Sequence, residues 1–211
     1  MSSLTTGICG SLNGVPVTNK FVDRPAQMES LEKCLLPRTE NERRTVLILH
    51  GLGGIGKTQL SAEFVRRHCH EYSSVFWLDG RTENSLKQGI ATIANRIPEG
   101  QISEKSRSYN GSNAQVGAVV KEVLQWLSTE GNHSWLLVFD DVYRDDHAMG
   151  KGVEEYNIES YFPRANHGYI LITTHLHWLG KYGCTVKLNA FDAYQAQTLL
   201  TEKIGRPFKG M

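Results

Sequence analysis

The sequence has little of what would place the protein in a membrane or an oxidising compartment. Its four cysteines are widely scattered, without C-x-x-C spacing or the composition of a small disulfide scaffold. No run approaches the roughly 18 apolar residues of a membrane-spanning helix, and the residues after Met1 lack the basic and apolar regions of a signal peptide. We therefore expect a soluble, cytoplasmic protein without a membrane partner.

An excess of charge of one sign is also absent. Lysine and arginine number 23 against 22 aspartates and glutamates, so no nucleic-acid partner is indicated. The 211 residues suffice for one domain with a substantial core. Because residues 1–18 are rich in Gly, Ser, Thr and Asn, we expect a flexible leader there, followed by a domain over 19–206 and a tail over 207–211.

What the chain does contain is an alternation of apolar strands and amphipathic helices. Continuous apolar strands indicate a parallel sheet that is covered on both faces, because a half-exposed sheet would alternate polar and apolar residues. The fold class predicted is α/β, with three layers and a five-stranded, mainly parallel sheet. The predicted strands are Thr45–His50, Ser74–Asp79, Trp135–Phe139, Tyr169–Thr173 and Thr185–Leu188.

The segments between the strands carry further expectations. Polar composition predicts a mobile loop over Glu99–Ser112 and another loop over Tyr143–Glu155. Apolar spacing predicts a helix from Ala26 that Pro37 stops. A short helical turn is expected over Ile158–Phe162, and a final helix over Ala193–Ile204.

The most informative motif is Gly51–Thr58, which fits G-x-x-x-x-G-K-[ST] between a strand and a helix. Glycines let such a loop wrap a phosphate with its backbone N–H groups. Lys57 supplies a positive charge to the outer phosphates, and Thr58 supplies a hydroxyl ligand for Mg²⁺. The predicted nucleotide-binding residues of this loop are Gly51, Gly53, Gly54, Ile55, Gly56, Lys57, Thr58 and Gln59.

Two aspartates end the third predicted strand. Asp140 is the candidate magnesium residue, through a coordinated water, and completes the site begun by Thr58. Asp141 is the candidate base or positioning group for an attacking water, and Lys57 is the second candidate catalytic residue. The alternative is that Asp-Asp caps the strand and begins a turn.

With these motifs in order, the chain resembles the NB-ARC nucleotide-binding domain of STAND signalling ATPases. That module is the switch of NOD-like receptors and apoptotic activators, which act in innate immunity and programmed cell death. Asn19–Arg24 is similar to the family element that holds adenine, which implies that Val22 and Arg24 contact the base. Gly168–Thr174 is similar to the strand that carries the phosphate sensor, which implies that His175 binds nucleotide.

The resemblance implies a P-loop core whose fourth strand lies between the first and third. It also implies a switch that binds ADP or ATP with Mg²⁺, hydrolyses ATP slowly and controls oligomerisation. Asp23, Pro25 and His175 depart from the family's Gly, Glu and Arg. A histidine is half-charged near pH about 6.5, so His175 is either a pH-dependent sensor or an exposed loop residue. Without the family's helical arm and winged-helix segments, we expect a monomer here and homo-oligomers only in a longer protein.

Other functions stay open. Adenine is favoured over guanine because no N-K-x-D or T-K-x-D segment is present. A nucleotide-binding scaffold without turnover is the main alternative. A P-loop kinase or motor ATPase is less favoured, since the sequence has no arginine-rich lid and no L-S-G-G-Q element.

Overall fold

The computed structural model describes residues 14–16, 21–37, 43–112, 115–142 and 156–191, together with residues 193, 196, 197 and 201. Most of the predicted leader, the 143–155 loop, the 207–211 tail and most of the final helix lie outside the described residues. Within this part of the chain, no helix is both long enough and apolar enough to cross a bilayer.

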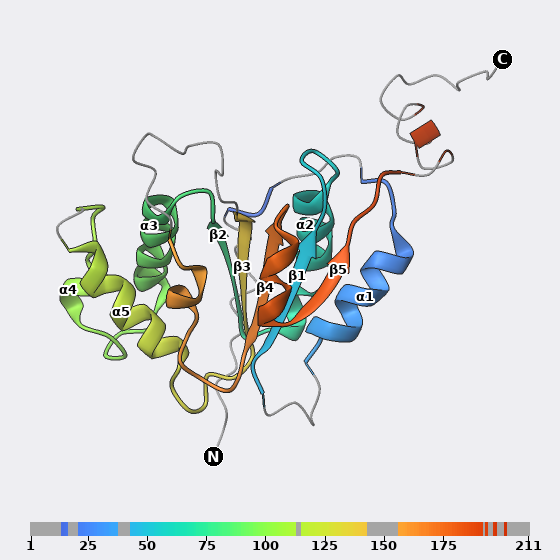
Figure 1. The fold of residues 1–211 in the computed structure, drawn as a ribbon. Helices are drawn as coiled ribbons and strands as arrows, with labels where there is room; N and C mark the ends of the chain where they lie inside the picture. The colour runs from blue at the N-terminus through green and yellow to red at the C-terminus, as the bar shows by residue number, and fades with distance from the viewer. Residues whose placement is uncertain are drawn as a thin grey trace, which may run out of the picture.

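Five strands form one sheet in the order β2-β3-β4-β1-β5, and every pair of neighbours is parallel (Figure 1). The fourth strand therefore lies between the first and third, as the resemblance implied. β3 runs three residues beyond its predicted end, and β5 begins one residue early. The strands are β1 Thr45–His50, β2 Ser74–Asp79, β3 Trp135–Val142, β4 Tyr169–Thr174 and β5 Cys184–Lys187.

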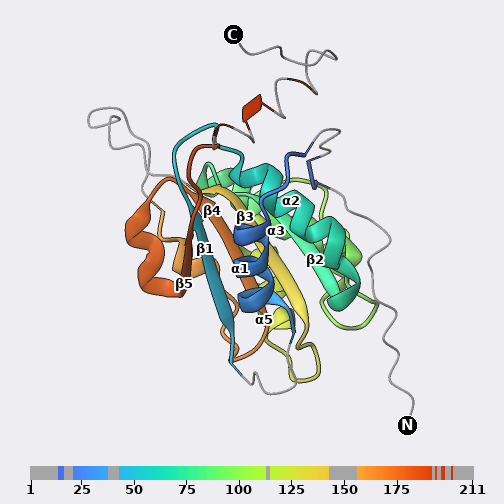
Figure 2. The same ribbon diagram turned by 90° about the vertical axis from the view of Figure 1, so that its right-hand side faces the viewer.

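Helices cover both faces of this sheet, which confirms the three-layer prediction. Helices α1 (Pro25–Leu35) and α2 (Lys57–His68) pack on one face (Figure 2), and α3 (Glu83–Ile93) and α5 (Val116–Leu127) pack on the other. Strand side chains alternate between the two cores. Leu47 and Leu49 join α1 and α2, whereas Val46 and Ile48 join α3 and α5. Burial on both faces explains the uninterrupted apolar strands.

Residue types at the helix ends explain where the helices begin. Pro25 occupies the first turn of α1, where its missing N–H is no loss. Thr82 caps α3, since its hydroxyl accepts from the Ser85 N–H at 3.0 Å while Ser85 Oγ accepts from the Thr82 N–H at 3.1 Å. Short 3₁₀ helices follow β3 and β4 at Ile158–Tyr161, as predicted, and at His177–Tyr182, which was not predicted.

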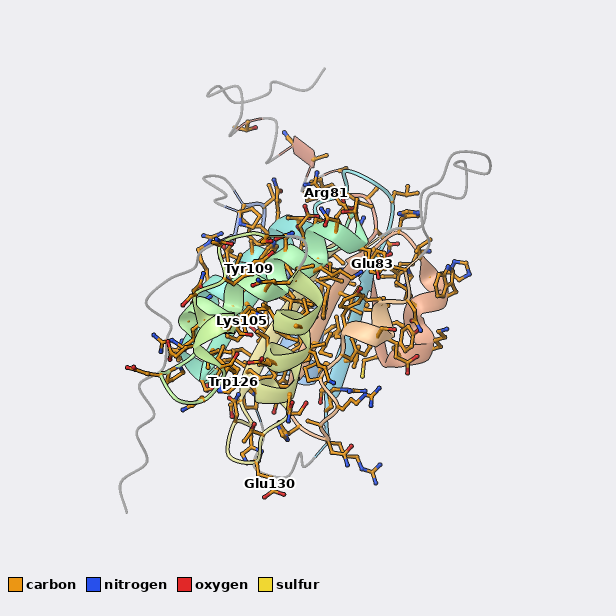
Figure 3. The ribbon with its side chains drawn as sticks, turned by 90° about the vertical axis from the view of Figure 1, so that its left-hand side faces the viewer. Arg81, Glu83, Lys105, Tyr109, Trp126 and Glu130 are labelled. Carbon is orange, nitrogen blue, oxygen red and sulfur yellow. The ribbon has the colours of Figure 1, made fainter. Side chains whose placement is uncertain are left out.

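The mobile loop predicted over Glu99–Ser112 is helical in part. The segment contains helix α4 (Glu104–Arg107), whose first turn is capped by Ser103. Tyr109 is buried and lies beside α3 (Figure 3). Its hydroxyl donates to Gln88 Oε1 at 2.6 Å. One aromatic anchor in a polar segment is too weak a pattern to show periodicity, so composition alone missed the ordered structure.

The cysteines also differ from expectation. Cys69 is buried at the end of α2 and is disulfide-bonded, although the spacing of the four cysteines did not indicate a disulfide. Cys184 is exposed and carries a free thiol.

Candidate functional site

The loop between β1 and α2 has the backbone that its glycines permit. Gly54 and Gly56 adopt φ of 72° and 100°, backbone angles that residues with a Cβ rarely adopt. Gly51 is required for a different reason: a Cβ there would lie 2.5 Å from the Leu188 carbonyl oxygen, at the end of β5. The loop therefore passes against the neighbouring strand as it leaves β1.

Lys57, the first residue of α2, closes this loop from inside. Its Nζ donates to the carbonyls of Gly51 at 3.0 Å and Leu52 at 2.9 Å, and the residue is only 8% exposed. Burial lowers the pKa of Lys57, and the nearby carboxylates of Asp141 and Asp140 oppose that shift. A partly desolvated ammonium group is thus fixed at the centre of the loop.

Asp140 stands beside the loop and is bonded by two threonine hydroxyls. Thr58 Oγ1 donates to Asp140 Oδ1 at 2.8 Å, and Thr173 Oγ1 donates to the same oxygen at 2.7 Å. Burial raises the pKa of Asp140, while these two hydrogen bonds act in the opposite direction. The structure thereby brings together both residues predicted for magnesium, Thr58 and Asp140.

A β-bulge separates Asp140 from Asp141. The register of β3 against β4 shifts between Phe139 and Val142, so one extra residue is accommodated there. Asp141 adopts φ of 60°, which aspartate tolerates better than most residues, and its side chain is exposed. Its backbone N–H donates to Thr173 Oγ1 at 2.7 Å. The two adjacent carboxylates therefore have different surroundings.

Val22 and Arg24 lie on the other side of the loop, in the segment before α1. Val22 is buried, and Arg24 is 3% exposed. The Arg24 guanidinium donates to the carbonyls of Ile55 at 3.1 Å and Asn189 at 2.8 Å. Arg24 is therefore brought to the predicted loop, while the base contacts expected of both residues stay predictions.

His175 follows β4 and is exposed. The buried Thr174 before it orders the turn, because Thr174 Oγ1 donates to the Val142 carbonyl and accepts from the Leu176 N–H at 3.0 Å. Whether His175 contacts nucleotide stays a prediction. At the end of β1, burial and then the charges of Lys187, His177 and Lys57 lower the pKa of His50.

One further residue of the site, Gly80, was missing from the sequence prediction, and Thr173, which the position at a strand end singles out, had no role assigned to it. Thr173 connects both aspartates, through the hydrogen bonds described above. Gly80 donates its N–H to the Asp140 carbonyl at 2.7 Å, and a Cβ on Gly80 would lie 2.6 Å from Val142 Cγ2. The signal available for Gly80 was its position, since it stands just after the carboxyl end of β2, where ligands bind in parallel sheets.

Fold and site together define a class of protein. A parallel sheet of order β2-β3-β4-β1-β5, a glycine-rich loop between β1 and α2, and a strand ending in aspartates are those of the P-loop NTPase fold. The family model for the NB-ARC domain matches residues 24–206. The chain belongs to this family, and it is accordingly a nucleotide-binding module of the signalling-ATPase type.

A relative from Hyaloscypha variabilis, a nucleotide-binding leucine-rich repeat (NLR)-like protein, is 28% identical over 173 residues. That match covers 78% of this chain and 16% of the relative, so the chain spans only a small part of the longer protein.

Solved structures share the fold at lower identity. A STAND protein with a tetratricopeptide repeat sensor from Pyrococcus horikoshii matches with a TM-score of 0.52 and 18% identity, over 90% of this chain and 26% of that one. Cdc6p from Pyrobaculum aerophilum matches with a TM-score of 0.57 and 15% identity, over 92% and 52%. The ORC2 protein of Aeropyrum pernix, solved as ADPNP-ADP complexes, matches with a TM-score of 0.52 and 15% identity, over 92% and 55%.

Proposed function

We propose that this chain is the nucleotide switch of a STAND signalling ATPase. It binds ADP or ATP with Mg²⁺, hydrolyses ATP slowly, and controls the oligomerisation and signalling of a longer protein according to the phosphate that it holds. Family membership supports the signalling role, and the absence of guanine-reading motifs supports adenine.

One observation supports the proposal most strongly. The Thr58 hydroxyl of the P-loop helix and the Asp140 carboxylate of β3 come within 2.8 Å, although the two residues are 82 positions apart. Mg²⁺ prefers hard oxygen ligands and keeps several waters, so a hydroxyl beside a carboxylate fits that ion. Thr58 would be the direct ligand, and Asp140 would hold a coordinated water. Mg²⁺ would supply charge neutralisation at the phosphates.

The remaining polar groups suit slow hydrolysis. Lys57 places its ammonium where the outer phosphates of a bound nucleotide would lie, and stabilises the charge that develops there. Asp141 is ionisable, exposed and next to Asp140, so it can orient a water and accept its proton. Its backbone is fixed through Thr173, which limits the directions that its carboxylate can take.

The test of binding is to denature the purified protein and identify the released nucleotide by chromatography. ADP or ATP supports the proposal. Guanine nucleotide would contradict the choice of base. If no nucleotide is released, calorimetric titration of the protein with Mg-ADP decides, and an absence of heat would contradict the proposal itself.

A scaffold that binds nucleotide without turnover is the second candidate. The exposed His175 favours it, because a histidine is a weaker phosphate sensor than the arginine usual in the family. Single-turnover hydrolysis by wild type and Asp141→Asn separates the two. A rate that falls about tenfold or more in the variant supports the ATPase, and equal background rates support the scaffold.

A further inference from the structure

Arg24 is more deeply buried than the P-loop lysine, at 3% against 8% exposed. Burying a charged group is costly unless it is bonded, so its contacts matter to the fold. Besides its two carbonyl acceptors, the guanidinium lies over the Phe191 ring, with its carbon 4.0 Å from the ring centroid. One side chain thus joins three segments: 21–24, the P-loop at Ile55, and 189–191 after β5.

The segment after β5 also packs against the beginning of the P-loop. The Leu188 N–H donates to the His50 carbonyl at 2.8 Å, directly before the loop. The Leu188 carbonyl approaches Gly51 so closely that no side chain fits there. Leu188 therefore fixes the first residue of the P-loop. Arg24 fixes the loop near its other end, at Ile55, and also bonds Asn189.

The hydrogen bond from Arg24 to the Ile55 carbonyl also fixes the direction of the next backbone N–H, that of Gly56. The Ile55 C=O and the Gly56 N–H belong to one planar, trans peptide unit, and so they point in opposite directions. A carbonyl held by Arg24 fixes the Gly56 N–H on the side away from Arg24. A charge-assisted hydrogen bond to the oxygen also polarises the peptide unit, which makes its N–H a stronger donor.

We propose that Arg24 is a positioning residue for phosphate binding: by holding the Ile55 carbonyl, it aims and polarises the Gly56 amide for an anionic phosphate oxygen. This inference rests on the proposed function and deepens it. It differs from a base contact, because its effect requires phosphate and is indifferent to adenine.

Base-free and phosphate-free probes separate the two roles. We would titrate ADP, inorganic tripolyphosphate and adenosine by calorimetry into wild type, Arg24→Gln and Arg24→Lys, with Mg²⁺ present. The matched control is Arg67→Gln, because Arg67 Nη2 bonds Asp23 of the same segment at 3.3 Å but is 41% exposed. Circular dichroism establishes which variants fold.

The expected result for Arg24→Gln is an affinity about tenfold lower for both ADP and tripolyphosphate, with adenosine binding and the Arg67→Gln control unchanged. Arg24→Lys should show a smaller loss of the same kind, because lysine keeps the charge but lacks the fork that reaches two carbonyls. If Arg24→Gln does not fold, Arg24→Lys decides alone. A loss confined to ADP and adenosine, or no loss at all, would overturn the inference.

A readout without ligand tests the same link. The amide proton resonance of Gly56 should move upfield in Arg24→Lys, as the polarising bond weakens, and stay in place in Arg67→Gln. An unmoved Gly56 resonance in Arg24→Lys would overturn the inference even if affinity fell. Failure of wild type to bind either ADP or tripolyphosphate would instead contradict the proposed function, and leaves the Gly56 measurement as the test of the contact itself.

Discussion

The P-loop is held differently on its two sides. Toward β3 and β4, charged groups stand in a partly buried corner: Lys57 inside the loop and Asp140 beside it. Toward β5, Leu188 and Arg24 hold the loop through backbone groups and close packing. In the first region, burial lowers the pKa of Lys57 and raises the pKa of Asp140, so it disfavours the charged form of each. A charged ligand that pairs with these groups would offset that cost. The second supplies a fixed shape.

Lys57→Ala should have the largest effect on nucleotide binding. This change removes the only side chain that donates to the Gly51 and Leu52 carbonyls among the described residues, together with the charge meant for the phosphates. We expect nucleotide affinity to fall by about a hundredfold or more, or about 2.7 kcal/mol. Calorimetric titration with Mg-ADP measures this loss. An affinity within threefold of wild type would contradict the role of Lys57.

Gly51→Ala tests the side of the P-loop that faces β5. The added Cβ would lie 2.5 Å from a backbone oxygen that cannot rotate away, so we expect the free energy of unfolding to fall by about 2 kcal/mol. Gly53→Ala is the matched control, because a Cβ there meets nothing within 4 Å. Urea unfolding of the ligand-free protein measures both. Equal losses in the two variants would show that the contact with Leu188 does not constrain the loop.

Asp140→Asn tests the region around Lys57 and Asp140. We expect it to raise the free energy of unfolding and to weaken the binding of Mg-ADP. Because the pKa of Asp140 is raised in the folded state, the folded protein binds more protons than the unfolded chain. The aspartate therefore costs stability once the pH rises above its ordinary carboxyl range, and this cost persists at neutral pH. The asparagine variant should be more stable than wild type at pH 7, with the gain vanishing in acid, yet bind Mg-ADP more weakly.

Urea unfolding at several pH values, without nucleotide or Mg²⁺, measures that gain. A variant less stable than wild type at pH 7 would show that the hydrogen bonds from Thr58 and Thr173 outweigh the cost of burying the charge.

The smallest effect is expected where the segment 21–24 meets α2 at the surface. Asp23 and Arg67 are 61% and 41% exposed and 3.3 Å apart, so solvent screens the pair. Asp23→Ala should change the free energy of unfolding by about 0.5 kcal/mol or less. A thermal melt beside Arg24→Gln measures the contrast, and an effect as large as that of Arg24→Gln would show that burial does not decide which contact matters.

Much of the fold could be predicted because its signals are local. Strands buried on both faces leave uninterrupted apolar runs, and the P-loop leaves its spacing of glycines and Lys57. The position of β4 between β1 and β3 is a long-range property that composition does not encode, and it came from the family resemblance. Helix α4 was missed because it is only four residues long and its one buried residue, Ser106, is polar, so it leaves no apolar pattern.

The site was predictable to a similar degree. Asp140 and Thr58 follow from strand ends and a motif, and the structure brings them together. The bulge that separates Asp140 from Asp141 depends on the register between β3 and β4, which no local pattern of either strand specifies. For the same reason the role of Thr173 was not predicted from its strand-end position, since that role is to connect residues of a neighbouring strand.

The proposed function depends on binding of an adenine nucleotide, together with Mg²⁺, by the P-loop, Lys57 and Asp140. The most direct measurement is a calorimetric titration of the nucleotide-free protein with ADP, with Mg²⁺ and with a chelator. We predict a dissociation constant in the micromolar range, about 8 kcal/mol, that weakens when the chelator removes Mg²⁺. An absence of heat in both titrations, from protein that circular dichroism shows to be folded, would contradict the account.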